Sequence, residues 1–245
     1  GNHETGPVAV GAAVVDQYGG ALMAMGILGA FVKRLTTGEG TRIEADLFSS
    51  AIDLQTEALT KYMARSGDGN ALERDRHVGS WYHDAPYGVY RLSDGTIALS
   101  MNDPVKLAKA LDSSRLAALD GIDRYDERDR YAGVVAEELA PRRFADVAHA
   151  FDENGIWYER VQDYDDLGND PQVHHNQVFR KIEVKEGTAT LVNHPLRYDG
   201  KIPEFKGIPL EAGQHSREVL AELGYGKSDI DRLLEAKVIF APDGG

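Results

Sequence analysis

The sequence predicts an α/β fold at both ends of the chain with an α+β block inserted between them. Near the N-terminus, an apolar run leads into a long stretch of small and apolar residues, a pattern typical of a buried strand followed by a closely packed helix. In the middle, two alternating segments flank Ser93-Asp94-Gly95, which is typical of a β-hairpin. A second strand pair and two short helical segments then close the chain.

The composition excludes several classes of function. The chain has 245 residues, 42% of them hydrophobic, which suffices for a substantial core. Lys and Arg number 27 against 40 Asp and Glu, so the net charge of −13 argues against nucleic acid or a membrane as partner. Cysteine is absent, which excludes disulfides, thiolate metal sites and cysteine nucleophiles and fits a cytoplasmic protein. The uncharged run over residues 18–32 is short for a membrane span, and no secretory signal is visible.

The first expected elements are a buried strand over residues 8–15 and a helix from Asp16 to about residue 35. Asp is a favoured N-cap because its carboxylate accepts hydrogen bonds from free backbone N–H groups. The helix is expected to end near Gly38, after two basic residues suited to a helix C-terminus. Alternation over residues 42–47 predicts another strand, and Ser49 is expected to cap a helix that reaches residue 65.

The later elements follow the same reasoning. The hairpin is expected over residues 87–91 and 96–101, and Asp103 is expected to cap a helix through residue 111. Helices are predicted near residues 128–139 and 143–154, an acidic irregular stretch over 159–170, strands over 178–184 and 188–192, and helices over 215–223 and 227–236. The predicted organisation is a large-domain part (1–66), a linker or active-site loop (67–84), a small α+β domain (85–192) and a return to the large domain (193–245).

Four features stand out as chemistry-bearing, each with a plainer interpretation. Asp16 is either a simple N-cap or a carboxylate nucleophile kept ionised by the positive end of a helix and opening onto a cleft. Asp103 has the same two interpretations. The cluster Trp81-Tyr82-His83 either lines a site or anchors its own loop. The adjacent pair at residues 174–175 is interpreted as two surface histidines, because no carboxylate stands three or four residues after them.

Several of these segments together resemble the family III CoA-transferases, a group that includes formyl-CoA transferase, carnitine CoA-transferase and alpha-methylacyl-CoA racemase. The resemblance begins with DQYGGALMAMGILGAF at residues 16–31 and IEADL at residues 43–47. It continues in order with APYGVYR at 85–91, DPQV at 170–173 and HSREVLAELGY at 215–225, so it covers essentially the whole chain.

The resemblance implies a mechanism for Asp16. It matches the family's catalytic aspartate, which attacks an acyl-CoA thioester and carries the acyl group and then CoA as covalent intermediates. The glycine-containing loop that shields such intermediates from water is matched best by Val78-Gly79-Ser80 and the aromatic cluster after it. Coenzyme A is then a substrate, with no resident cofactor and no metal. The residues expected to bind substrate or CoA are Gln17, Tyr18, Gly79, Tyr82, His83 and Asp103.

The resemblance also leaves alternatives. In the racemase branch a glutamate takes the place of Asp103, so Asn102-Asp103-Pro104 is closer to the transferases; a non-catalytic subunit of a split transferase is a further possibility. Family members carry a Rossmann-like half before the equivalent of Gly1 and form interlocked dimers. We therefore expect only the C-terminal part of a Rossmann-like large domain, with most CoA-binding residues before Gly1. The chain is expected to work as a homodimer or with a partner chain carrying the N-terminal half, and, taken alone, to leave apolar surface on residues 19–32 uncovered.

Overall fold

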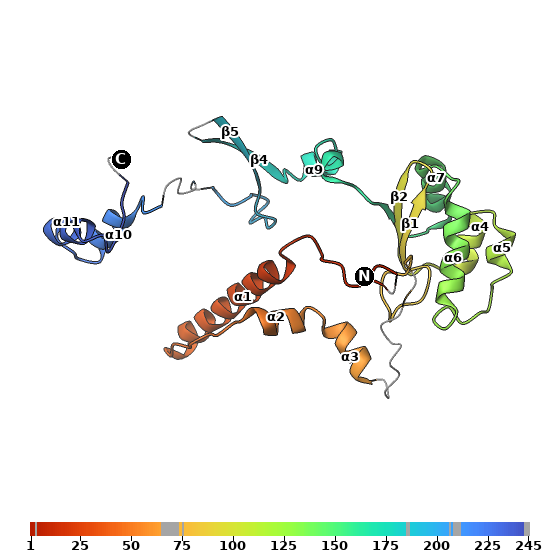
Figure 1. Cartoon of the computed structure of the whole chain (residues 1–245), viewed down its shortest axis with the longest axis horizontal. Helices are drawn as coiled ribbons and strands as arrows, with labels where there is room; N and C mark the ends of the chain where they lie inside the picture. Colours follow the sequence, from red (N-terminus) through yellow and green to blue (C-terminus); the bar gives the residue numbers. More distant parts are fainter. Residues whose placement is uncertain are drawn as a thin grey trace. The chain divides into compact units, whose positions relative to one another are not determined.

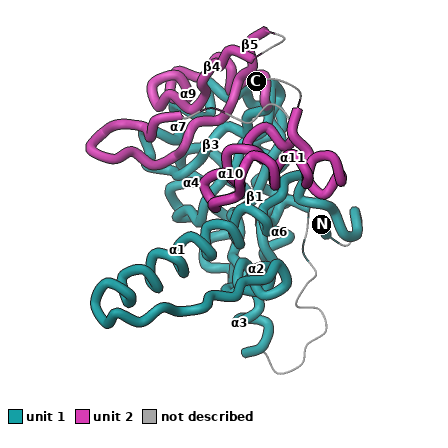
Figure 2. The backbone as a smooth tube through the Cα atoms, turned by 90° about the vertical axis from the view of Figure 1, so that its left-hand side faces the viewer, with its two compact units in different colours: residues 1–163 teal, residues 164–245 magenta. Residues whose placement is uncertain are grey.

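The computed structural model describes residues 1–2, 4–64, 74, 76–184, 187–205, 207 and 212–242. They form two compact units, Gly1–Asp163 and Tyr164–Gly245, which Figure 2 distinguishes by colour. Figure 1 labels helices and strands of both units, and β3 is labelled in Figure 2. The sequence-based boundaries at residues 66, 84 and 192 stay predictions.

The first unit opens with three helices, α1 (Val14–Thr37), α2 (Leu47–Asp53) and α3 (Thr56–Ala64). The strand predicted over residues 8–15 is wrong, since residues 8–13 are irregular and Val10 is 75% exposed. Gly11 has a φ of 79°, a left-handed conformation that interrupts an extended run. The helix begins at Val14 with Ala13 at the N-cap, so Asp16 lies in the first turn and is not the cap.

The connection from α1 to α3 also differs from the prediction. Gly38, with a φ of 76°, ends α1 near the expected place by donating its N–H to the Arg34 carbonyl at 2.9 Å. Residues 42–46 form no strand, and Asp46 instead of Ser49 caps α2 by accepting the Ser49 N–H at 2.7 Å. That hydrogen bond lowers the pKa of Asp46. The single helix predicted to residue 65 is broken at residues 54–55 into α2 and α3.

Small residues let α1 approach its neighbours closely. A Cβ on Gly19 would lie 3.1 Å from Ser50 Oγ, and one on Gly26 would lie 3.3 Å from Ile43 Cγ2. The rest of α1 remains uncovered, as the sequence predicted, and its window of highest mean hydropathy (1.3) is only 6% buried. By length and composition alone α1 could cross a membrane, a test that core helices of water-soluble proteins also pass. Its large exposed apolar side chains are Met25, Ile27, Leu28, Phe31, Val32 and Leu35.

A three-stranded antiparallel sheet forms the centre of the first unit. Its strands are β1 (Gly88–Leu92), β2 (Gly95–Leu99) and β3 (Tyr158–Arg160), in the order β1-β2-β3. Val89 faces Ala98 across β1 and β2, and Ala98 faces Glu159 across β2 and β3. The predicted hairpin is confirmed. The segment predicted as irregular contains the end of β3 at its start and helix α8 (Tyr164–Leu167) later, and sequence reasoning missed both.

Four helices accompany this sheet: α4 (Pro104–Ala110), α5 (Ser114–Ala117), α6 (Arg128–Leu139) and α7 (Phe144–Asn154). The predictions of α4, α6 and α7 are confirmed. Helix α6 packs on β1 and α7 packs on β2. The hydrophobic core lies between these helices and the sheet, and its largest side chains with less than 2% exposure include Tyr90, Ile97, Leu107, Tyr131 and Phe151.

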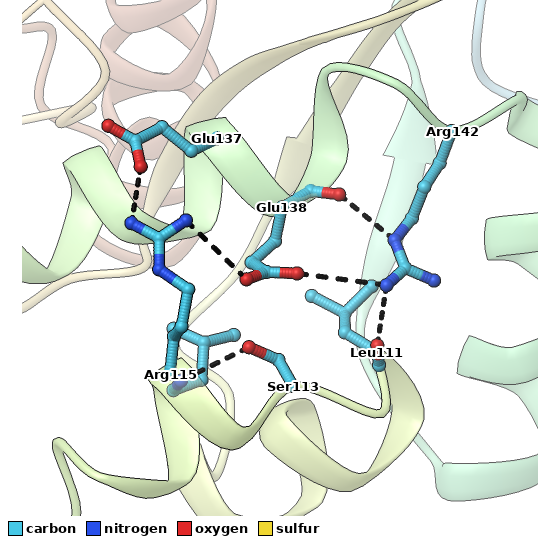
Figure 3. Close-up of polar contacts among 7 residues, drawn as sticks. Leu111, Ser113, Arg115, Glu137, Glu138 and Arg142 are labelled. Carbon is cyan, nitrogen blue, oxygen red and sulfur yellow. Dashed lines mark hydrogen bonds and ion pairs between the residues drawn. The ribbon is translucent and has the colours of Figure 1, made fainter.

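Two arginines tie these helices together, as Figure 3 shows. Arg115 of α5 pairs with Glu137 and Glu138 of α6. Arg142 donates to the Leu111 carbonyl at 2.6 Å and to the Glu138 carbonyl at 2.9 Å. Because Arg115 is half exposed, its ion pairs orient the helices more than they stabilise them.

The second unit contains the elements α8 (Tyr164–Leu167), α9 (Pro171–His175), β4 (Phe179–Val184), β5 (Gly187–Val192), α10 (Ser216–Glu222) and α11 (Lys227–Glu235). Strands β4 and β5 form an antiparallel hairpin in which Arg180 faces Leu191. The predicted strand pair and the two final helices are confirmed. Both sheets among the described residues are antiparallel, so the Rossmann-like layering of the large domain stays a prediction.

Candidate functional site

Asp16 lies on the exposed first turn of α1. The first backbone N–H groups of a helix have no partner within the helix, and the helix dipole favours a negative charge there. Within the described residues, Asp16 has no hydrogen bond or ion pair with another side chain. The strand predicted to place it in a cleft is absent, so the helix start alone positions this carboxylate.

The two residues after Asp16 differ in their surroundings. Gln17 is exposed, whereas Tyr18 is half-buried and its hydroxyl donates a hydrogen bond to Asp53 of α2. This hydrogen bond raises the pKa of Tyr18. Tyr18 therefore joins the start of α1 to the end of α2, whatever further role it has.

Residues 78–87, here called the docked loop, close on the start of β1 through backbone contacts. Val78 is buried and forms an isolated bridge with Gly88, and the Gly79 N–H donates to the Tyr87 carbonyl at 2.8 Å. A Cβ on Gly79 would lie 2.8 Å from Tyr87 Cε1. A side chain at position 79 would therefore displace the Tyr87 ring.

Side chains then hold the docked loop against α3. His83 Nδ1 lies 2.6 Å from Ser80 Oγ, and its Nε2 lies 3.8 Å from a carboxylate oxygen of Glu57. The Tyr82 hydroxyl donates to the same carboxylate at 3.4 Å, and burial raises the pKa of Tyr82. The His83 ring lies between the rings of Tyr82 and Tyr87, at centroid distances of 4.5 and 4.6 Å. Both ring nitrogens of His83 therefore have neighbours within the protein.

The remaining aromatic residue of the cluster makes the same connection. Trp81 meets Tyr62 of α3 edge-on, with ring centroids 6.4 Å apart. The interpretation of the cluster as an anchor for its own loop is therefore supported, and the binding role of Tyr82 and His83 stays a prediction.

Asp103 is the N-cap of α4, as predicted. Its Oδ1 accepts hydrogen bonds from the N–H groups of Val105 at 2.9 Å and Lys106 at 3.1 Å. The preceding Asn102 is buried, donates to the Ser100 and Trp157 carbonyls, and accepts the Trp157 N–H at 2.7 Å. These bonds fix the backbone from which Asp103 projects.

Arg124 links this region to the docked loop. Its Nη1 donates to the Ala85 carbonyl at 3.0 Å and to the Asn102 carbonyl at 3.2 Å. Sequence reasoning missed Arg124 and Glu57, and it named Ser80 and Asn102 without predicting their contacts, because each acts through partners distant in sequence or in a segment without periodicity. No hydrogen bond or ion pair among the described residues joins Asp16 to the docked loop or to Asp103.

The described residues contain no group of three or more His, Asp or Glu side chains that could hold a metal ion. His174, one of the two adjacent histidines, instead places Nε2 2.9 Å from the Gly168 carbonyl.

Comparison with known proteins identifies the family. A model of CoA-transferase family III matches residues 1–216. The chain belongs to CoA-transferase family III. The resemblance read from the sequence is thereby confirmed.

Curated members of the family align with nearly the whole chain. An (R)-2-hydroxy-4-methylpentanoate CoA-transferase from Clostridioides difficile is 28% identical over 96% of this chain and 60% of its own length. A succinyl-CoA:glutarate CoA-transferase from Mus musculus is 27% identical over 98% of this chain and 56% of its own. Human alpha-methylacyl-CoA racemase is 26% identical over 92% of this chain and 59% of its own. The chain thus spans about 60% or less of the length of these relatives.

Solved structures support the fold. A CaiB/BaiF family protein from Brucella suis superposes with a TM-score of 0.67 at 20% identity, covering 91% of this chain and 58% of that one. Rv3272 from Mycobacterium tuberculosis, in an orthorhombic form, gives a TM-score of 0.66 at 20% identity, covering 89% and 58%. This mixed α/β chain therefore has the fold of the corresponding part of family III proteins.

Proposed function

We propose that this chain carries the nucleophile of a CoA-transferase that moves CoA between an acyl-CoA thioester and a carboxylic acid. The observation that carries the proposal is the exposed Asp16 carboxylate at the start of the long helix α1, in a chain of CoA-transferase family III. A helix N-terminus favours the anionic form that a carboxylate nucleophile needs.

The reaction divides one exchange into four acyl transfers. The Asp16 carboxylate attacks the thioester carbonyl and expels CoA thiolate, leaving an acyl-aspartyl anhydride. The thiolate then attacks the Asp16 carbonyl and releases the first acid, which leaves an aspartyl-CoA thioester. The incoming carboxylate attacks that thioester and expels CoA thiolate again. The thiolate finally attacks the new acyl carbonyl, which forms the product thioester and frees Asp16.

Water competes with the thiolate for the anhydride, so the site must exclude it. We assign the exclusion of water to the docked loop, since Gly79 permits its close turn and the Ser80–His83–Glu57 contacts hold it on α3. Such a loop would open for substrate and close during acyl transfer. Gln17, Tyr18 and Asp103 are proposed to contact the substrate.

The decisive experiment traps the intermediate. The assembled protein is incubated with an acyl-CoA and treated with hydroxylamine or borohydride, and the modified residue is located by peptide mass spectrometry. Modification at Asp16, and its loss together with transfer activity in Asp16→Ala, supports the proposal. Glu218→Gln serves as the control and should keep full activity, because Glu218 is also an exposed carboxylate in the first turn of a helix, α10, but has no role in the proposed site. Full transfer activity in Asp16→Ala would refute the covalent mechanism and favour a non-catalytic role.

A second candidate is an acyl-CoA racemase, favoured by the similarity to human alpha-methylacyl-CoA racemase. This activity exchanges the proton on the α-carbon and forms no anhydride. Incorporation of deuterium from heavy water into the acyl-CoA, without a trapped Asp16 adduct, would select it.

We also propose that the working protein is an assembly, either a homodimer or a complex with a chain that supplies the remaining CoA-binding surface. The support is the row of exposed apolar side chains along α1, which is larger than the isolated apolar residues of an ordinary surface. Analytical ultracentrifugation tests this: a monodisperse monomer with full transfer activity would contradict it.

A further inference from the structure

The second unit contains a pocket that the proposed chemistry does not use. It has a volume of about 1150 Å³ and is lined by residues of α9, of the β4–β5 hairpin and of the following segment up to Phe205. That volume is slightly above the roughly 300–1,000 Å³ typical of small-molecule sites and far exceeds what a single ion needs. We call it the basic pocket.

The charge of the basic pocket is unusual for this protein. Its cationic lining residues are Arg180, Lys181, Arg197 and Lys201, and no Asp or Glu is among the described residues that line it. The chain as a whole carries a net charge of −13. A concentration of like charge costs free energy unless an anion neutralises it, so this arrangement needs a reason other than solubility.

The two arginines are oriented by neutral partners. Arg180 donates from Nε to the side-chain oxygen of Asn193, and its guanidinium carbon lies 5.2 Å from the centre of the Phe205 ring. Arg197 donates to the Asn176 carbonyl at 2.6 Å and to the Gln177 side-chain oxygen at 3.4 Å. These contacts fix the direction of each guanidinium but leave its charge without a carboxylate among the described residues.

Fixed guanidinium groups are suited to phosphate, because their parallel N–H donors match two phosphate oxygens at once. The lysines add point charges, and neither Lys181 nor Lys201 has an ion pair with a described residue. Apolar side chains, Phe179, Ile182 and Phe205, line the same pocket and offer surface to an organic group.

We propose that the basic pocket binds a small organic phosphate monoester, with the phosphate on the arginines and lysines and the organic part against the phenylalanines. The proposal does not depend on the role of Asp16. The phosphate could come from free phosphate or from a nucleotide, and the test separates these two sources.

Isothermal titration calorimetry of the full chain uses three probes: inorganic phosphate, adenosine 3′,5′-bisphosphate and adenosine. We expect the bisphosphate to bind, inorganic phosphate to bind at least tenfold more weakly, and adenosine not to bind. Affinity for the bisphosphate should fall as the salt concentration rises. Equal affinity for inorganic phosphate would overturn the assignment of an organic ligand, and binding of adenosine alone would overturn the phosphate site.

Variants locate the binding. Lys201→Gln and Arg180→Gln should each weaken bisphosphate binding at least fivefold, whereas Lys227→Gln, on α11 and outside the pocket lining, should leave it unchanged. If Arg180→Gln disturbs the hairpin, as circular dichroism would show, Lys201→Gln decides where the ligand binds, because the Lys201 side chain has no hydrogen bond or ion pair with a described residue. Absence of binding by the wild type, or equal weakening by Lys227→Gln, overturns the proposal.

Discussion

The clearest stability prediction concerns two buried tyrosines in the same core. Tyr131 of α6 and Tyr90 of β1 are both 0% exposed. The Tyr90 hydroxyl donates to the Pro86 carbonyl at 2.9 Å, whereas the Tyr131 hydroxyl has no partner among the described residues. Tyrosine-to-phenylalanine substitution therefore removes a hydrogen-bonded hydroxyl at position 90 and a hydroxyl without a partner at position 131, both within one hydrophobic core.

The expected free energies have opposite signs. A buried hydroxyl without a partner destabilises the fold by about 1–3 kcal/mol. Tyr131→Phe should recover part of that, about 1 kcal/mol, because some dispersion contact is lost with the oxygen. Tyr90→Phe leaves the Pro86 carbonyl without its donor, so it should destabilise the fold by about 1–3 kcal/mol.

Urea and thermal unfolding followed by circular dichroism measure both changes. For a domain of this size, each kcal/mol shifts Tm by roughly 2–4 °C. We expect Tm to rise in Tyr131→Phe and to fall in Tyr90→Phe. A loss of stability in Tyr131→Phe equal to that in Tyr90→Phe would refute the reasoning, since it would mean that the Tyr131 hydroxyl has a partner.

Three further predictions follow from the same structure. Burial raises the pKa of Tyr131 to about 12 from its ordinary 10.0. Between pH 10 and 12 the folded chain therefore keeps a proton that the unfolded chain loses, so the free energy of unfolding should fall as the pH rises. Urea titrations at each pH should show a smaller fall in Tyr131→Phe. Asp103→Ala removes the N-cap of α4 and should destabilise the fold by about 1 kcal/mol, whereas Asp103→Asn keeps the cap and the stability. If both variants lose activity, the charge of Asp103 is functional. Glu57→Gln should speed amide hydrogen exchange of the docked loop by about twofold to fivefold, as expected from the loss of an exposed ion pair. The same variant should raise the ratio of acyl-CoA hydrolysis to transfer. Unchanged exchange would contradict the contact between Glu57 and His83.

Local patterns predicted much of the small domain correctly. The hairpin over β1 and β2, the Asp103 cap and helices α6 and α7 are encoded within short stretches, where turn residues, capping and periodicity act between near neighbours. The strand predicted over residues 8–15 is wrong because strand formation depends on a partner that the local sequence does not supply. An apolar run becomes a strand only when a partner satisfies its backbone, and none among the described residues does so.

The residues of the candidate site also divide into those that the sequence predicted and those that only the contacts in the structure reveal. Asp16, the docked loop and Asp103 were found from residue type, position and resemblance. Glu57, Arg124 and the contacts of Asn102 were not, because they depend on segments far along the chain. The basic pocket was missed for a related reason: Arg180 and Arg197 lie 17 positions apart, and neutral partners that no local pattern reveals orient them.

The amino-acid sequence alone predicted the family, the nucleophile to test, most helices and strands, and the uncovered apolar face of α1. These depend on residue identity and on spacing within a few turns of chain. Three features became visible only in the folded chain. Asp16 follows the helix start instead of capping it, and both ring nitrogens of His83 have partners within the protein. Cationic side chains also gather in one pocket of an acidic chain. Hydrogen bonding, packing and local charge depend on distances in space, and these arise only when distant segments fold together.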